Sequence, residues 1–212
     1  MEGEISILVL KRSYNGPLPY CRLQLTGGRE FILDLGAGEN LSQGEQVDAG
    51  ALAHFARQDL LFRLLRKGLE LASLREHSRF ELQQKLVKRF DRSSRSAEEF
   101  PELLSAALDR LEGLGYLNDR RFAESWVLRR LSRRGEGAGL LRRGLGVRGI
   151  GRELAGEVLE KCLTPGAETA ALEKAVLKLS RRGFAGEELR RRLLGLGFNA
   201  GRVRAFLSGD GE

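Results

Sequence analysis

An internal repeat restricts what this chain can fold into more than any other feature of its sequence. When residues 131–159 are shifted by 48, they lie on residues 179–207, and the letters LSRRG at 131–135 recur at 179–183. A weaker third copy begins upstream, near Glu81. Each copy predicts a long helix, a short helix and a third helix after a glycine-containing turn. A single unit of this size buries its apolar face poorly, so the copies should stack in a row. We therefore predict a mostly α-helical fold of tandem three-helix repeats in an elongated array.

The first part of the chain has a different pattern. Apolar residues alternate along residues 5–35, for example Ile7 and Val9, and glycine-rich breaks divide this stretch into three short runs. Alternation with period two is typical of strands that bury one face. A three-residue loop of Thr-Gly-Gly, with the second glycine left-handed, would pair Leu23 with Phe31 and match the apolar faces of two strands. The sequence therefore predicts a small N-terminal antiparallel β-sheet.

Helical periodicity begins near residue 49. Residues 49–72 form a long amphipathic run in which Gly68 is a possible interruption. Ser78 and Glu81 have the spacing of a capping box at the start of a helix. Asn118 is a candidate N-cap for a later helix.

These patterns divide the chain into consecutive parts, and the polar, Ser-rich residues 91–99 are expected to form an exposed loop. The expected parts are an N-terminal β-sheet appendage (1–48), a linker helix with helical repeat 1 (49–118), helical repeat 2 (119–163) and helical repeat 3 (164–212).

Positive charge is concentrated in the last two repeats. The chain has 36 basic and 29 acidic residues; residues 119–212 carry a net charge of +8, whereas residues 1–58 carry −2. A basic surplus of this kind favours a polyanionic partner, either a nucleic acid or an acidic protein surface. The alternative is that these charges only form a solvated helix face.

Arginines at equivalent repeat positions are the candidate binding residues. Arginine suits such a role, because its guanidinium grips a carboxylate or a phosphate with two parallel hydrogen bonds. The single tryptophan, Trp126, is interpreted as a core residue between repeats in preference to a base-stacking residue. The candidate partner-binding residues are Arg129, Arg130, Arg133, Arg134, Arg142, Arg143, Arg181, Arg182, Arg190, Arg191 and Arg192.

The sequence offers no pattern typical of an enzyme. A phosphate-binding loop of the Gly-rich Lys-Ser/Thr type is missing, and His54 and His77 have no partner at a catalytic spacing. We expect no catalytic residue, no metal site and no cofactor. Cys21 and Cys162 lie far apart and no apolar run is long enough to span a membrane, which predicts a reduced, cytoplasmic protein without membrane contact. It is expected to be a monomer.

Three motifs together resemble a known family. They are GYLNDRRFA followed by ESWV at 115–127, SxxELxxKL at 78–86 and LSQGEQVD at 41–48. This set resembles the signatures of the RecX family of bacterial recombination regulators. The segment of residues 91–102 is longer than the corresponding segment in the family's pattern. The resemblance implies a regulator that binds RecA nucleoprotein filaments on single-stranded DNA, in the filament's helical groove.

The same resemblance implies that such a regulator mostly inhibits RecA's strand exchange and ATP hydrolysis during DNA repair, recombination and the SOS response. The alternative function is a general module that binds single-stranded or double-stranded nucleic acid directly.

Overall fold

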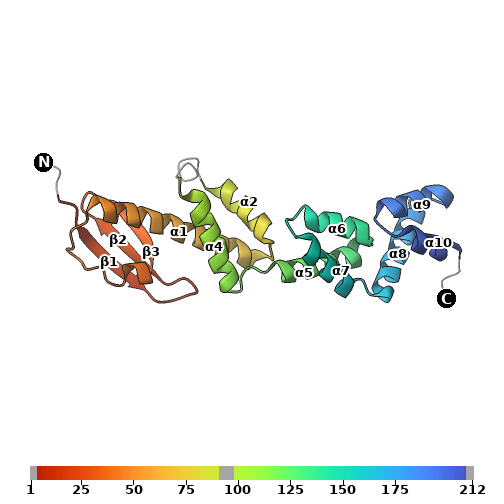
Figure 1. Ribbon diagram of the computed structural model, residues 1–212, viewed down its shortest axis with the longest axis horizontal. Coiled ribbons are helices and arrows are strands. Elements are labelled where there is room, and N and C mark those ends of the chain that lie inside the picture. The colour runs from red at the N-terminus through yellow and green to blue at the C-terminus, as the bar shows by residue number, and fades with distance from the viewer. Residues whose placement is uncertain (1–3, 91–97, 209–212) are drawn as a thin grey trace. The chain divides into compact units, whose positions relative to one another are not determined.

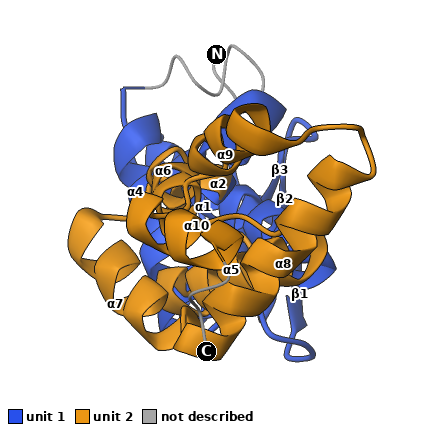
Figure 2. Ribbon diagram, turned by 90° about the vertical axis from the view of Figure 1, so that its right-hand side faces the viewer, with its two compact units in different colours: residues 1–75, 82–117 blue, residues 76–81, 118–212 orange. Residues whose placement is uncertain are grey.

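The computed structural model describes residues 4–90 and 98–208, in which nine α-helices follow one three-stranded sheet (Figure 1). The predicted mostly helical fold of three-helix repeats behind a small antiparallel sheet is confirmed. Residues 91–97 of the expected polar loop lie outside the described residues. The chain forms two compact units, unit 1 with residues 1–75 and 82–117, and unit 2 with residues 76–81 and 118–212 (Figure 2).

The sheet of unit 1 has the strand order β1-β2-β3, and its second hairpin has the predicted register. Leu23 lies opposite Phe31, and Leu25 N donates to Arg29 O at 2.8 Å, which leaves a loop of three residues, 26–28, with both glycines at positive φ. The positive φ of Gly28 is the left-handed conformation that the loop prediction required. The strands are β1 (Ile7–Ser13), β2 (Tyr20–Leu25) and β3 (Glu30–Asp34).

Strand β1 departs from the predicted alternation. Ile7 pairs with Leu25, but the register then shifts, so that Leu10 lies opposite Leu23. Leu10 packs with Ile7 against the sheet's core, whereas Val9 does not. The prediction that Ile7 and Val9 share the apolar face is wrong, because one extra residue in a strand reverses which side chains point inward.

Three helices complete unit 1: α1 (Ala49–Leu74), α2 (Arg79–Arg89), whose first turn belongs to unit 2, and α4 (Phe100–Gly113). The sheet packs on the first half of α1, where the rings of Phe31 and Phe55 are 6.0 Å apart. Gly68 does not interrupt α1. A Cβ atom there would lie 2.5 Å from Leu111 Cδ1, so the glycine allows α4 to pack closely against α1.

Unit 2 contains the second and third repeats around one continuous apolar core. Asn118 caps the first of its helices as predicted, because its Oδ1 accepts a hydrogen bond from Arg121 N at 2.9 Å. Repeat 2 comprises α5 (Asp119–Arg134), α6 (Ala138–Gly146) and α7 (Arg152–Cys162). Repeat 3 comprises α8 (Pro165–Ser180), α9 (Gly186–Gly195) and α10 (Ala200–Ser208).

Glycines join the two repeats of unit 2 backbone to backbone. Gly137 N donates to Leu196 O and Gly139 N donates to Gly197 O, both at 2.9 Å. A Cβ atom on Gly137 would lie 2.4 Å from Phe198 N, and one on Gly197 would lie 2.1 Å from the backbone N of the residue after Gly139. No side chain fits at either position. The start of α6 therefore packs directly on the turn between α9 and α10.

The same kind of contact recurs one repeat earlier, also within unit 2. Ser78 at the start of α2 donates from Oγ to Arg148 O at 2.7 Å, in the turn between α6 and α7. A Cβ atom on Gly149 would lie 2.3 Å from Phe80 Cβ. Gly149 and Gly197 are separated by the 48-residue shift of the repeat. In both cases the start of a short helix, α2 or α6, therefore packs on the glycine-containing turn of the next repeat.

Candidate polyanion-binding interface

The candidate arginines lie mainly on exposed helix surfaces, but their surroundings differ. Four are on α5, two on α6, three on α9 and two in the turn after α8. Arg130 and Arg190 are half-buried and the other nine are exposed. The contacts of each guanidinium show which of these arginines stabilise the fold and which are available to a partner.

The side chain of Trp126 lies between two arginines. It is 6% exposed, and the guanidinium carbons of Arg130 and Arg148 lie 4.8 and 4.7 Å from its ring. A Cβ atom on Gly144 would lie 2.3 Å from the ring, so this glycine of α6 makes the space that the tryptophan fills. The prediction that Trp126 is a core residue is confirmed, although the ring packs against α6 of its own repeat. Both arginines therefore support the fold.

Carboxylates hold these two arginines in place. Glu136, which is 5% exposed, lies 3.1 Å from Arg130 Nη1, and Glu81 lies 3.3 Å from Arg148 Nε. Burial lowers the pKa of Arg130, and the nearby charges of Arg134, Arg148 and Arg129 lower it further, against the opposing effect of Glu136. Arg130 Nε and Glu136 Oε2 have no hydrogen-bond partner. Arg130 is therefore committed to a buried ion pair.

The arginines of α9 are neutralised within their own helix. Arg190 lies 3.0 Å from Glu187, and Arg192 lies 3.0 Å from Glu188, with Arg191 3.9 Å from the same carboxylate. These spacings of three and four residues place each arginine on the same helix face as its glutamate. The sequence already contained this signal, because Glu187 and Glu188 directly precede the arginines.

Aromatic packing engages two arginines of repeat 3. The guanidinium carbon of Arg192 lies 3.6 Å from the centre of the Phe184 ring, and that of Arg182 lies at 5.8 Å. Together with the ion pairs of α9, these contacts reduce the charge that repeat 3 offers to a partner.

Six of the candidates have neither an acidic nor an aromatic partner among residues 4–90 and 98–208, and all six are exposed. Solvated arginines of this kind can bind a carboxylate or a phosphate without first breaking an internal pair. We call these residues the unpaired set: Arg129, Arg133, Arg134, Arg142, Arg143 and Arg181.

The charges of three arginines on α5 interact with one another. Arg129 and Arg134 both act electrostatically on Arg130, and Arg148 joins them from the turn after α6. Sequence reasoning missed Arg148, since only the fold carries it to the face of Trp126.

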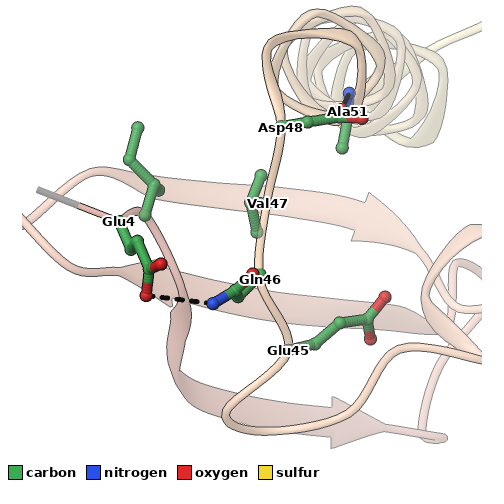
Figure 3. A pocket seen from close by; sticks show the side chains of 7 residues that line it. Glu4, Glu45, Gln46, Val47, Asp48 and Ala51 are labelled. Carbon is green, nitrogen blue, oxygen red and sulfur yellow. Dashed lines mark hydrogen bonds between the residues drawn. The ribbon is translucent and has the colours of Figure 1, made fainter. Parts of the chain in front are cut away.

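A hollow beside the N-terminal sheet has the opposite charge. Figure 3 shows its lining, where Gln46 donates from Nε2 to Glu4 at 3.0 Å and Asp48 accepts from Ala51 N at 2.7 Å to cap α1. The hollow measures about 490 Å³, and its ionisable lining residues, including Glu45, are carboxylates. An acidic hollow repels phosphates, so it is not part of the candidate interface.

The described part of the chain contains neither a cluster of metal ligands nor a membrane-spanning helix. Among residues 4–90 and 98–208, no three His, Cys, Asp or Glu side chains are close enough to hold a metal ion together. None of the helices in these ranges has the length and apolar character needed to cross a membrane.

Three-helix repeats that follow a small sheet along the chain define a helical-repeat protein, and comparison with known proteins gives its family. Residues 118–159 match the family model described as the second three-helix domain of RecX. The regulatory protein RecX of Chromohalobacter salexigens is 33% identical over 138 residues, which cover 58% of this chain and 85% of that protein. The chain belongs to the RecX family.

Other relatives match over shorter segments. The regulatory protein RecX of Pseudomonas fluorescens is 38% identical over 104 residues, and that of Ralstonia pickettii is 44% identical over 92 residues. These matches cover 49% and 43% of this chain, and 61% and 52% of the respective relatives. The chain therefore aligns with little more than half the length of these two proteins.

Two solved structures share the fold. A crystal structure of a regulatory protein RecX superimposes with a TM-score of 0.73, covering 93% of this chain and 96% of the other at 20% identity. RecX from Lactobacillus salivarius gives a TM-score of 0.57, covering 71% and 96% at 22% identity. The likeness over nearly the whole chain extends the agreement to the N-terminal sheet and all three repeats.

Proposed function

We propose that this chain regulates the RecA recombinase by binding RecA nucleoprotein filaments on single-stranded DNA in their helical groove. In this proposal it mostly inhibits strand exchange and RecA's ATP hydrolysis, within DNA repair and recombination. Membership of the RecX family supports a regulatory role, because the matching relatives are named regulatory proteins. The partner and the direction of the effect come from the resemblance of the sequence motifs.

The unpaired set is the structural observation that supports this proposal, because it supplies the residues proposed to contact the filament. Five of its six arginines lie on α5 and α6 of repeat 2, and none has an ion-pair partner in the described ranges. A RecA filament on DNA offers both carboxylates and phosphates, and exposed guanidinium groups bind either with charge-assisted hydrogen bonds. Repeat 2 is therefore proposed as the main contact, with Arg181 as an additional contact from repeat 3.

The second candidate function is a general nucleic-acid-binding module. The net charge of +8 over residues 119–212 favours it, since basic surfaces bind phosphate backbones without regard to sequence. The ion pairs within α9 weaken it, because Glu187 and Glu188 interrupt a continuous basic track. A binding face of mixed charge suits a protein surface better than a bare phosphate chain.

The deciding experiment measures RecA's ATP hydrolysis on single-stranded DNA while the concentration of this protein rises. The filament proposal expects hydrolysis to fall at concentrations at which the protein binds little bare single-stranded DNA. Unchanged hydrolysis at full occupancy of the filament would contradict inhibition. Hydrolysis that falls only when the protein also saturates bare DNA would support the general nucleic-acid module.

A matched pair of variants tests the contacting residues. Arg142 and Arg143 correspond to Arg190 and Arg191 through the 48-residue shift, but only the second pair is neutralised by neighbouring carboxylates. Changing the first pair to Ala should weaken filament binding on the order of a hundredfold, if two charge-assisted contacts are lost. Changing the second pair should cost distinctly less.

Both variants should remain folded, because exposed arginines contribute little to stability. Equal losses in the two variants, measured by filament binding and by inhibition, would show that net charge and not the unpaired set determines the interaction.

A further inference from the structure

Unit 1 contains a second basic surface, which lies outside the basic residues 119–212. A hollow of about 410 Å³ lies between α1 and the end of α2. Four of its six lining residues are cationic and one is acidic. We call it the unit 1 groove, and its lining consists of Arg63, Arg66, Lys67, Glu70, Arg89 and Phe90.

The single carboxylate of the groove neutralises only one of the cations. Lys67 Nζ lies 2.7 Å from both oxygens of Glu70, and this hydrogen bond lowers the pKa of Glu70, with Arg89 and Arg66 adding to the effect. Arg63 lies 3.9 Å from Asp59. Within residues 4–90 and 98–208, Arg66 and Arg89 have no ion-pair partner, and both are exposed. The groove therefore has an excess of positive charge that an anion can neutralise.

An apolar pocket of about 220 Å³ adjoins the groove, and Arg66 lines both. Tyr20 and Phe62 form part of this pocket, with their ring centres 5.7 Å apart, and Leu69 adds an aliphatic side. A second cation, Arg22, also lines it. Cations beside an apolar, partly aromatic pocket match a ligand that joins a phosphate to a flat ring.

We propose that unit 1 binds single-stranded nucleic acid, with phosphodiester groups on Arg66 and Arg89 in the groove and one base in the apolar pocket. Single strands present unstacked bases next to evenly spaced phosphates, and such bases bind aromatic and apolar surfaces without regard to sequence. A base within a duplex cannot enter a pocket unless it leaves its pair. A nucleic acid places a ring next to every charge, whereas an acidic protein segment does so only where an aromatic residue adjoins a carboxylate.

This inference goes beyond the proposed function, because the contact requires no RecA and lies in the other unit from most of the unpaired set. Its test therefore uses bare DNA. The full chain is titrated into a fluorescein-labelled oligothymidylate, and binding is followed by anisotropy at several salt concentrations. The groove variant carries Arg66→Ala and Arg89→Ala. The control carries Arg29→Ala and Lys88→Ala, which removes the same charge from exposed residues of unit 1 outside the groove.

The groove variant should bind the oligonucleotide about tenfold more weakly or worse at low salt. The slope of log affinity against log salt should become shallower by roughly 0.7 for each lost phosphate contact. The control should change little in either respect. Equal losses in the two variants, or no loss in the groove variant, would overturn the groove as a phosphate site.

Two further probes test the chemistry of the ligand. An abasic oligonucleotide of the same length keeps the phosphates but lacks the rings, so it should bind several-fold more weakly than oligothymidylate. Equal binding would overturn the placement of a base in the apolar pocket. Poly-L-glutamate supplies carboxylates alone. If the groove variant loses affinity for poly-L-glutamate but keeps its affinity for DNA, the groove is a site for an acidic protein and the proposal is wrong.

Discussion

Serine substitutions at two helix N-caps provide a direct test of how the repeats of unit 2 are joined. Gly137 is the N-cap of α6 and Gly151 is the N-cap of α7, and both have extended backbone angles that any residue can adopt. A Cβ atom on Gly137 would lie 2.4 Å from Phe198 N, whereas a Cβ atom on Gly151 has no atom within 4 Å. The two sites therefore differ in the space around the new side chain and not in local conformation.

The expected effects have opposite signs. Gly151→Ser should stabilise the protein by about 0.5–1 kcal/mol, because serine is a good N-cap and restricts the unfolded chain more than glycine does. Gly137→Ser must push the backbone of repeat 3 away. This movement costs about 1–3 kcal/mol for overpacking, and it strains the two 2.9 Å hydrogen bonds from Gly137 N and Gly139 N, each with a net value of about 0.5–1.5 kcal/mol. The net loss should be about 2–4 kcal/mol.

Urea unfolding followed by Trp126 fluorescence measures the difference, since this single tryptophan lies in the core of repeat 2. With a urea dependence of about 1–3 kcal/mol per molar, the midpoints of the two variants should lie at least about 1 M apart. Circular dichroism should give coincident transitions if the change is cooperative. Equal midpoints for the two variants would refute the direct backbone contact between repeats 2 and 3.

Two further predictions concern unit 1. Gly68→Ala should destabilise the protein by about 1–3 kcal/mol in thermal or urea unfolding, because the added methyl would lie 2.5 Å from Leu111 Cδ1. The control, Gly156→Ala in α7, has open space around the new methyl and should be neutral or stabilising. An equal response at both glycines would contradict the close packing of α1 against α4. Asp59 accepts a 2.8 Å hydrogen bond from Ile32 N, and burial raises the pKa of its carboxyl against the lowering effects of that bond and of Arg63. A raised pKa in the folded state means that stability from the protonated form is present at low pH and is lost as pH rises through that pKa. Asp59→Asn keeps an acceptor oxygen but does not ionise, so its stability relative to the parent should rise as pH increases from about pH 4, the ordinary range of an Asp carboxyl, and stay constant once Asp59 is ionised in the folded protein; a relative stability that falls as pH rises would show that the ion pair outweighs burial.

Local sequence signals specified many of the elements of the fold. The pairing of Leu23 with Phe31 followed from matching apolar faces across a short loop, and Asn118 capped the helix that its position predicted. These features depend on residues that are close along the chain, where side-chain direction follows from backbone periodicity. Strand β1 shows the limit of this approach, because the extra residue between Ile7 and Leu10 is fixed by pairing with β2 and has no local signature.

Glycine was the residue that sequence reasoning explained least well. Glycine is a weak helix former, and Gly68 was expected as a possible interruption, yet Gly68, Gly139, Gly144 and Gly146 all lie within helices. Contacts with distant segments explain three of the four. Gly68 faces Leu111, Gly144 faces Trp126, and Gly139 approaches the backbone of the turn between α9 and α10. Such roles cannot be inferred from helix propensity, because they depend on which distant segment packs against the glycine.

The sequence by itself determined the repeat, its three-helix units, the sheet's second hairpin and the location of most of the basic residues. Only the tertiary structure decided what each basic residue does. Arg130 and Arg148 are taken up by Trp126 and by two carboxylates, and the α9 arginines by neighbouring glutamates. Packing within unit 1, in turn, gathers the cations of the unit 1 groove from two helices, α1 and α2, that are separated along the sequence. The physical reason is that an arginine's availability depends on every charge and ring within a few ångströms, and the sequence specifies only those neighbours that lie within one or two helical turns.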